Sequence, residues 1–210
     1  MLRYLTSRNL SELADLRASM FADRARQFRD RLNWAVTVDE RGWERDDYDD
    51  LDPVYVIWQR PDGLHGGSMR FLPTGGRTMV NDHFRHLAGG RRISHPKVWE
   101  CTRFCLAADT DAQVAARLML GGAELGAGLG LTRAVGVFDA RMVRIYRHLG
   151  WEPDILGSAG QGRDAVSLGF WRFSEATRQR MAHKAGIPAA LSRQWYLSDM
   201  REPVPALAAV

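Results

Sequence analysis

The sequence has few cysteines and no long apolar run. Only two of its 210 residues are cysteines, Cys101 and Cys105. Four positions apart on one strand, they would lie about 13 Å from each other, beyond disulfide reach, so we expect both thiols to be reduced. No stretch approaches the ~18 uncharged apolar residues of a membrane span, and the N-terminus lacks the apolar core of a signal peptide. These absences indicate a cytoplasmic protein without membrane insertion.

The spacings of common metal and nucleotide sites are also missing. The six histidines are scattered without HExxH or similar spacing, and neither cysteine has a CxxC partner, so we expect no metal site. No GxSxG or P-loop pattern occurs. The glycines between positions 121 and 130 follow a predicted helix and precede a predicted strand, which is the wrong order for a dinucleotide loop.

Composition and charge are those of an ordinary globular protein. Hydrophobic residues make up 45% of the chain and charged residues 26%. We expect one domain over residues 1–200 and a disordered tail at 201–210. A net charge of +4 fits a basic nucleic-acid-binding module, but 29 basic against 25 acidic residues is mixed rather than polarised. Nucleic acid is therefore the least favoured partner.

Hydrophobic periodicity predicts an order of strands and helices. A first helix is expected from Asn9 to about Phe28, with a capping box formed by Asn9 and Glu12. The remaining predictions are strands at 54–59, 67–72, 97–106, 131–138 and 165–173, helices from Asp109-Thr110 to about 125, at 140–149 and at 174–186, and an irregular segment at 73–96. This order favours an α/β fold with a mixed sheet.

The predicted strand from Lys97 to Leu106 is apolar on both faces, yet it carries Glu100 and Arg103. An unpaired buried charge costs several kcal/mol, so each must have a partner or do chemistry. The strand alone does not distinguish an internal ion pair from a catalytic site. Strict alternation places the two side chains on opposite faces, so a direct pair requires a bulge or a third partner.

Isolated arginines also occur in other apolar elements. Arg17 and Arg24 fall on the apolar face of the first helix, and Arg70 lies in a predicted strand. Arg17 can extend its head to water, whereas Arg24 can equally border a pocket. Six acids occupy residues 44–52, which is either a solvated loop or a source of counter-charges. We predict one network of Arg24, Asp46, Asp49, Arg70 and Arg103.

The helix expected at 140–149 carries Arg141, Arg144 and Arg147, one every third residue. Such a basic ridge is either a solubility feature or a surface that receives an acidic partner.

These residues resemble the acyl-homoserine-lactone synthases, the autoinducer synthases of bacterial quorum sensing. The resemblance covers about residues 2–172. It rests on an ordered set of pieces: Arg24-x-x-x-Phe28, Trp34, Asp46-x-x-Asp49, Arg70, Phe84, Glu100-x-x-Arg103-Phe104, and the segment 131–151 ending in Gly150-Trp151. The resemblance implies a single-domain GNAT-like fold of the α/β (α+β) class, a three-layer αβα sandwich whose mixed central sheet is splayed into a V-shaped cleft.

The resemblance also implies an N-acyltransferase. The family acylates the amine of S-adenosylmethionine from an acyl thioester, closes the lactone and releases methylthioadenosine; S-adenosylmethionine is a substrate, and no cofactor is implied. Glu100 would be the base, and backbone N–H groups around Thr102 to Phe104 would hold the oxyanion. Two pockets are carried over by position. The adenosylmethionine pocket and its ionic cluster would be formed by Arg24, Phe28, Trp34, Asp46, Asp49, Arg70, Phe84, Arg103 and Phe104. The acyl pocket would be formed by Val135, Gly136, Val137 and Trp151.

The acyl donor is expected to be acyl carrier protein docked on Arg144 and Arg147, with Arg141 less involved. The segment 107–110 lacks the glycines of a GNAT pyrophosphate loop, which counts against an ordinary N-acetyltransferase. Acyl-CoA is the alternative donor. Gly136 falls where relatives that prefer a 3-oxo chain often carry a hydroxyl, so an unsubstituted chain is expected.

Overall fold

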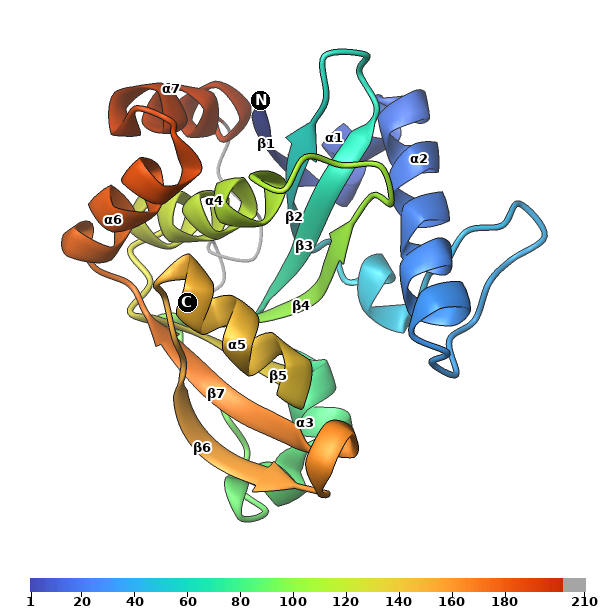
Figure 1. The fold of residues 1–210 in the computed structure, drawn as a ribbon, viewed down its shortest axis with the longest axis vertical. Helices are drawn as coiled ribbons and strands as arrows, with labels where there is room; N and C mark the ends of the chain where they lie inside the picture. Colours follow the sequence, from blue (N-terminus) through green and yellow to red (C-terminus); the bar gives the residue numbers. More distant parts are fainter. Residues whose placement is uncertain (202–210) are drawn as a thin grey trace.

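The computed structural model describes residues 1–201, in which seven strands form one mixed sheet (Figure 1). They are β1 (Leu2–Thr6), β2 (Val54–Gln59), β3 (His65–Pro73), β4 (Val98–Leu106), β5 (Arg133–Asp139), β6 (Asp154–Ala159) and β7 (Val166–Arg172). Their order across the sheet is β1-β2-β3-β4-β5-β7-β6. Only the central pair, β4 and β5, is parallel. The expected mixed sheet is confirmed; the predicted tail at 201–210 lies almost entirely outside the described residues.

Helices cover both faces of the sheet (Figure 1). They are α1 (Ser7–Ser11), α2 (Ala14–Ala25), α3 (Met79–His83), α4 (Val114–Gly128), α5 (Ala140–Leu149), α6 (Glu175–Ala185) and α7 (Ala189–Asp199). Buried leucines and aromatics of α1 and α2 pack against β2 on one face. The larger core lies on the other face, between the sheet and α4 to α7. This is the predicted three-layer sandwich. Among the described residues, no helix has the length and apolarity needed to cross a membrane.

The sheet splits between its two central strands. β4 and β5 pair at three positions only, ending at Glu100 and Val135. On its other side, the register of β4 against β3 shifts between Ser68 and Arg70, and opposite this shift Arg103 adopts a φ of 55°. An extra residue of this kind bends the strand and increases its twist. The predicted V-shaped cleft and the anticipated bulge are therefore both present.

The prediction of one continuous first helix was wrong. The hydroxyl of Thr6, not the side chain of Asn9, caps α1 by accepting a hydrogen bond from the Asn9 N–H at 3.3 Å. The helix is interrupted between α1 and α2, and α2 continues into a π-helical turn over Arg26–Arg31. Leu10 and Leu16 are both buried in the same cluster. A continuous helix would direct them about 120° apart, so the break lets both reach the sheet.

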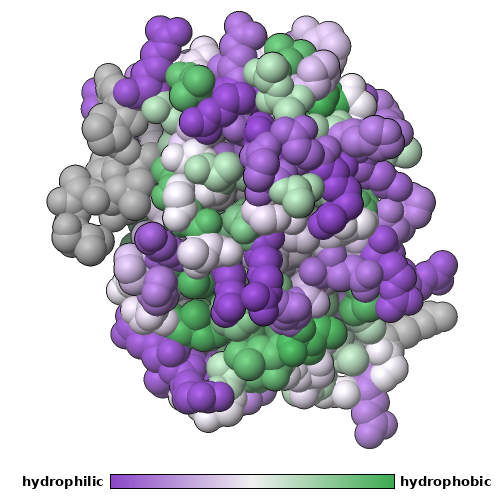
Figure 2. Space-filling view, turned by 90° about the vertical axis from the view of Figure 1, so that its left-hand side faces the viewer, coloured by the Kyte–Doolittle hydropathy of each residue, from purple (hydrophilic) through white to green (hydrophobic). Residues whose placement is uncertain are grey.

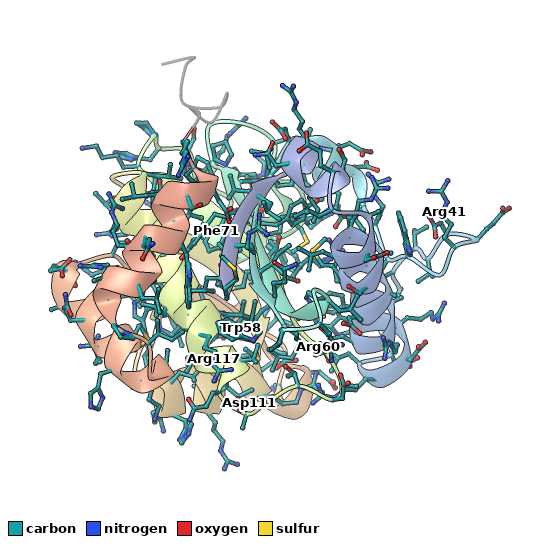
Figure 3. All side chains as sticks on the ribbon, turned by 90° about the horizontal axis from the view of Figure 1, so that it is seen from above. Arg41, Trp58, Arg60, Phe71, Asp111 and Arg117 are labelled. Carbon is teal, nitrogen blue, oxygen red and sulfur yellow. The ribbon has the colours of Figure 1, made fainter. Side chains whose placement is uncertain are left out.

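Other element boundaries also differ from the predictions. α4 begins at Val114 rather than at Asp109-Thr110, and Asp111 accepts the N–H of Gln113 at 2.8 Å. Asp109 instead pairs with Arg60 at 3.0 Å. Asp111 pairs with Arg117 at 3.1 Å, and Figure 3 labels both residues and Arg60. The irregular segment 73–96 contains α3 and a 3-10 turn at Arg85–Ala88, while β1, β6 and α7 were not predicted at all.

The two edges of the sheet differ. At the β1 edge, the carboxylate of Asp199 in α7 accepts the backbone N–H of Tyr4 and the Nε–H of Arg3, both at 2.9 Å. At the opposite edge, Ile155 and Leu156 of β6 are 54% and 45% exposed. Figure 2 shows hydrophobic residues gathered low on this side of the molecule, at the height of β6. One edge is thus closed by α7, and at the other edge β6 pairs only with β7 among the described residues.

Candidate active site

A cavity of about 250 Å³ lies where the sheet splits. Its outer end is lined by Gln27, Phe28, Arg31, Leu32 and Trp34, its middle by residues 101–104 of β4 and 136–139 of β5, and its inner end by Met69, Phe71, Met119, Gly122, Tyr146, Trp151, Trp171 and Phe173. The middle begins directly after the last β4–β5 pair. The cavity therefore has an outer end lined by aromatic and cationic side chains and an apolar inner end inside the protein.

Two stacked aromatic rings form the outer end. The rings of Phe28 and Trp34 lie 5.1 Å apart at an interplanar angle of 10°. Phe28 is buried, whereas Trp34 is 43% exposed. The guanidinium of Arg103 lies 5.3 Å from the centre of the Phe28 ring. Aromatic faces attract cations, and Arg103 already takes this place beside Phe28, with its charge balanced by Glu44 and Asp46.

An ionic cluster stands behind this end of the cavity. Its members are three arginines and three carboxylates: Arg24, Arg70, Arg103, Glu44, Asp46 and Asp49. Charges of opposite sign are equal in number. The five residues predicted to form one network do contact one another, so that structural prediction is confirmed.

Glu44 is the member that the sequence prediction missed. Its carboxylate, fully buried, accepts hydrogen bonds from Arg24 at 2.6 Å and from Arg103 at 2.9 Å. Arg24 also makes two bonds to Asp49, at 2.9 and 3.0 Å. Glu44 thus links α2 to β4. The sequence indicated only that Glu44 begins the acidic run at residues 44–52. It did not indicate which of the six acids in that run would pair with the buried arginines.

The cluster keeps Arg24 and Asp49 charged. Burial alone would lower the pKa of Arg24, but Asp49 and Glu44 raise it well above its usual value. Burial alone would raise the pKa of Asp49, but Arg24 and Arg70 hold it well below its usual range. Arg70 also donates from Nε to the hydroxyl of Thr102 at 3.1 Å. Arg103 and Thr102 line the cavity, so the cluster fixes the wall that they form.

Glu100 is almost fully buried at the end of the β4–β5 pairing. Its carboxylate accepts the backbone N–H groups of Met79 at 3.1 Å and Val80 at 2.5 Å, at the start of α3. Glu100 therefore has partners, but they are backbone N–H groups and not a charged side chain. Burial raises the pKa of Glu100 to about 7, although the two N–H groups oppose this shift. Glu100 does not itself line the cavity, but Met79 and Thr102 do.

The structure corrects three other placements. Phe84 and Val135 do not line the cavity; they pack with Val80 and Leu168 in a separate apolar cluster. Val135 shares its face of β5 with Val137, which packs against this cluster as well as lining the cavity, whereas Ala134, Gly136 and Phe138 on the other face all line the cavity. Arg24 is 1% exposed and reaches the cavity only through the cluster.

Six other residues predicted for the two pockets do line the cavity. Phe28, Trp34, Phe104, Gly136, Val137 and Trp151 all line it. The prediction missed the inner wall, which includes Phe71, Met119, Gly122 and Trp171. These residues carry no sequence signal of a site, because apolar side chains in strands and helices are the ordinary composition of a core.

α5 closes one side of the cavity. Arg141 and Ile145 line it, and Arg141 forms an ion pair with Asp139. Arg144 and Arg147 are exposed on the same helix. Arg147 lies 3.4 Å from a carboxylate oxygen of Glu152, and both side chains are more than half exposed. The predicted ridge therefore consists of exposed side chains beside the cavity, and two of its three arginines are paired with carboxylates.

A second constellation involves Asp23, His65 and Ser68. Asp23 lies 2.7 Å from Nδ1 of His65, and Nε2 of His65 lies 3.0 Å from the hydroxyl of Ser68. The order resembles a Ser-His-Asp triad, but all three side chains are buried and none lines the cavity. They connect α2 to β3. Within residues 1–201, no group of three or more His, Cys, Asp or Glu side chains could hold a metal ion.

Known proteins share this sequence pattern. The sequence model of the family described as autoinducer synthase matches residues 7–181. An acyl-homoserine-lactone synthase from Rhizobium etli is 43% identical over 180 residues, which cover 81% of this chain and 84% of that protein. Another from Agrobacterium fabrum (strain C58 / ATCC 33970) is 34% identical over 159 residues, which cover 70% of this chain and 71% of that protein.

Solved structures share the fold. A CoA-dependent acyl-homoserine lactone synthase, BjaI, solved with SAM and isopentyl-CoA, has a TM-score of 0.80 at 22% identity over 92% of this chain and 99% of that chain. An acyl-CoA N-acyltransferase from Pseudomonas aeruginosa has a TM-score of 0.53 at 14% identity over 82% of this chain and 99% of that chain. The GNAT-like fold expected from the resemblance is confirmed.

Proposed function

Because this chain belongs to the autoinducer synthase family, we propose that it is an acyl-homoserine-lactone synthase that acylates S-adenosylmethionine from an acyl thioester in the cytoplasm. The observation that carries this proposal is the cavity at the split of the sheet, whose two ends differ. One end has stacked aromatic rings, whose faces suit a sulfonium cation, and the charge of Arg103 beside them is balanced by Glu44 and Asp46. The other end is lined by apolar side chains, which suits a hydrocarbon chain.

In the first step, the amine of S-adenosylmethionine attacks the thioester carbonyl. The new N–C bond replaces the C–S bond, and the thiol leaves with a proton. The amine, with a pKa near 8, must first lose its own proton. Glu100 is the proposed base, acting through one water because its carboxylate does not line the cavity, and a carboxylate with a pKa of about 7 is well matched to this transfer. Backbone N–H groups of residues 102–104, beyond the last β4–β5 pair, are the proposed oxyanion donors.

In the second step, the carboxylate of the methionine moiety displaces the sulfonium. A C–O bond forms at the γ carbon while the C–S⁺ bond breaks, which releases neutral methylthioadenosine and the lactone. The leaving group is good, so the chief requirement is a conformation that brings the carboxylate to the γ carbon. The cluster of Arg24, Arg70, Arg103 and their three carboxylates holds the cavity wall rigid for this purpose.

Direct product detection tests the proposal. Purified protein is incubated with S-adenosylmethionine and a series of saturated acyl thioesters, and the products are identified by mass spectrometry. We expect an N-acyl-homoserine lactone and methylthioadenosine in equal amounts. N-acetylation of an amine from acetyl-CoA, with no methylthioadenosine, would instead identify an ordinary N-acetyltransferase.

Acyl carrier protein is the proposed donor. In GNAT enzymes the coenzyme A diphosphate lies in a glycine-rich loop before the helix that follows the central strand. The corresponding loop here contains Asp109 and Asp111, which pair with Arg60 and Arg117 (Figure 3). The two arginines are already paired with these carboxylates, so the loop offers a diphosphate neither glycine N–H groups nor an unpaired guanidinium among the described residues. The exposed ridge on α5 lies beside the cavity and fits a strongly acidic carrier instead.

We expect Arg144→Glu combined with Arg147→Glu to raise the KM for acyl carrier protein about tenfold and to weaken its salt dependence, because exposed charges mainly steer encounter. Binding of S-adenosylmethionine should be unchanged. Steady-state kinetics at several salt concentrations measure both effects. Arg8→Glu, an exposed arginine on α1 in the opposite layer, is the control and should change neither.

The same kinetics decide between the two donors. With identical acyl chains on both carriers, kcat/KM should be higher for the carrier protein than for coenzyme A. Equal or higher kcat/KM for acyl-CoA would refute the proposed donor while leaving the synthase activity in place. The ridge would then be a solubility feature.

A further inference from the structure

α4 contains four glycines, and each needs a reason because glycine destabilises a helix interior relative to alanine. They are Gly121, Gly122, Gly126 and Gly128. At three of them a neighbouring side chain already fills the space. A Cβ atom would lie 2.5 Å from Val56 at position 121, 2.3 Å from the Phe173 ring at position 126, and 2.1 Å from the Tyr196 ring at position 128. These three glycines allow close packing.

Gly122 differs from the others. A Cβ atom there would lie 3.3 Å from Cε of Met69 and 3.5 Å from Cζ of Phe71, both at the ends of side chains. Gly122 is buried, and it lines the cavity. Met69 and Phe71 also line the cavity, and a contact of 3.3 Å is tighter than usual, so an added methyl group would fill the narrow gap between α4 and β3 at the cavity wall.

The surroundings of Gly122 are apolar. Met119 lies one helical turn earlier and also lines the cavity. Phe71 faces α4 from β3, and Figure 3 shows it deep inside the molecule. The ionic cluster and Arg103 are at the opposite end. If the thioester carbonyl lies near residues 102–104, the methyl end of an acyl chain points to this inner wall.

We propose that Gly122 sets the upper limit of acyl chain length by leaving room for the terminal carbons between α4 and β3. The inference rests on the proposed synthase function. Gly136 is unsuited to this role, because a Cβ atom there would lie 2.9 Å from the carbonyl oxygen of Cys101, in the split itself. Gly136 therefore borders the carbonyl end of the chain, and Gly122 its methyl end.

The test compares kcat/KM for saturated acyl donors of increasing length on one carrier. Gly122→Ala should lower kcat/KM about tenfold for the longest donor that the wild type uses well, since one methylene in an apolar pocket is worth that much. Donors two carbons shorter should stay within about twofold of wild type, so the optimum shifts to shorter chains. Gly122→Val should shift it further. Adding Phe71→Leu to Gly122→Ala should return activity to the longer donor.

Gly121→Ala is the matched control, because its added methyl group meets Val56 on the sheet side and not the cavity. Gly121→Ala should lower the melting temperature but leave unchanged which acyl chain length gives the highest kcat/KM. An unchanged optimum in folded Gly122→Ala and Gly122→Val, or an equal loss for all donors, would overturn the inference. Absence of lactone from every donor with the wild-type enzyme is a separate result that would refute the proposed function itself.

Discussion

Glu100→Gln should lower kcat by about 10² or more, the usual scale for loss of a positioned base. The amide cannot accept the proton of the attacking amine. It also offers one oxygen where the carboxylate offers two, so either Met79 or Val80 loses its acceptor. We therefore expect a modest loss of stability as well, and activity must be expressed per folded molecule.

The pH dependence separates these two effects. A base must be ionised, so wild-type kcat/KM should rise as the pH increases through about 7, the pKa to which burial raises Glu100. A second rise near pH 8 belongs to the amine of free S-adenosylmethionine. In the Glu100→Gln variant, kcat/KM should no longer rise near pH 7 but should still rise near pH 8. Rates measured from pH 6 to 9 reveal both.

Glu124→Gln is the matched control, because Glu124 is equally buried, pairs with Arg178 and lies outside the cavity. It should cost stability and leave the rate per folded molecule unchanged. If Glu100→Gln behaved in the same way, Glu100 would serve only to hold the start of α3. The proposed base would then have to be sought elsewhere.

The second large effect concerns the ionic cluster. Asp49→Asn should lower the free energy of unfolding by about 3–5 kcal/mol, because it leaves Arg24 and Arg70 with an excess of buried positive charge. The Tyr55 hydroxyl, which donates to Asp49 at 2.8 Å, would also lose a charged acceptor. Urea denaturation monitored by fluorescence measures the change. The pKa of Asp49 is held below its usual range, so its contribution to stability should decline as the pH falls below about 4.

Asp50→Asn is the control, since Asp50 belongs to the same acidic run but its side chain is 73% exposed beside Arg45. An exposed pair contributes about 0–1 kcal/mol, so the change should be small. A double-mutant cycle between Arg24→Met and Asp49→Asn should give a coupling energy well above ~0.5 kcal/mol. Additive effects would show that the two side chains act independently.

The cluster could be predicted from sequence because buried charge requires opposite charge. Isolated arginines in apolar elements and one acidic run left few ways to satisfy that rule. The identity of Glu44 could not be predicted, because six acids lie within nine positions. The partners of Glu100 were equally hidden. They are backbone N–H groups some 20 residues earlier, in a segment whose composition indicated only an irregular loop.

The missed elements share a physical cause. β6 is mostly exposed, so it lacks the alternation of apolar and polar residues that marks a strand. In α7 only Ser192 and Tyr196 are buried, which leaves no continuous apolar face. The inner wall of the cavity was missed for the opposite reason. Its residues follow the core pattern, and only the departure of β5 from β4 turns that core into a cavity.

The closure of the β1 edge by α7 has a consequence for how the chain folds. Tyr4 and Asp199 are 195 residues apart in sequence, so this contact contributes to a high contact order and forms late. During synthesis, the N-terminal strand leaves the ribosome long before its partner helix exists. Until then the edge presents unpaired backbone groups, the kind of surface on which chains associate wrongly. The last helix therefore protects the first strand, and the protein completes its fold only after almost all of the described chain has been made.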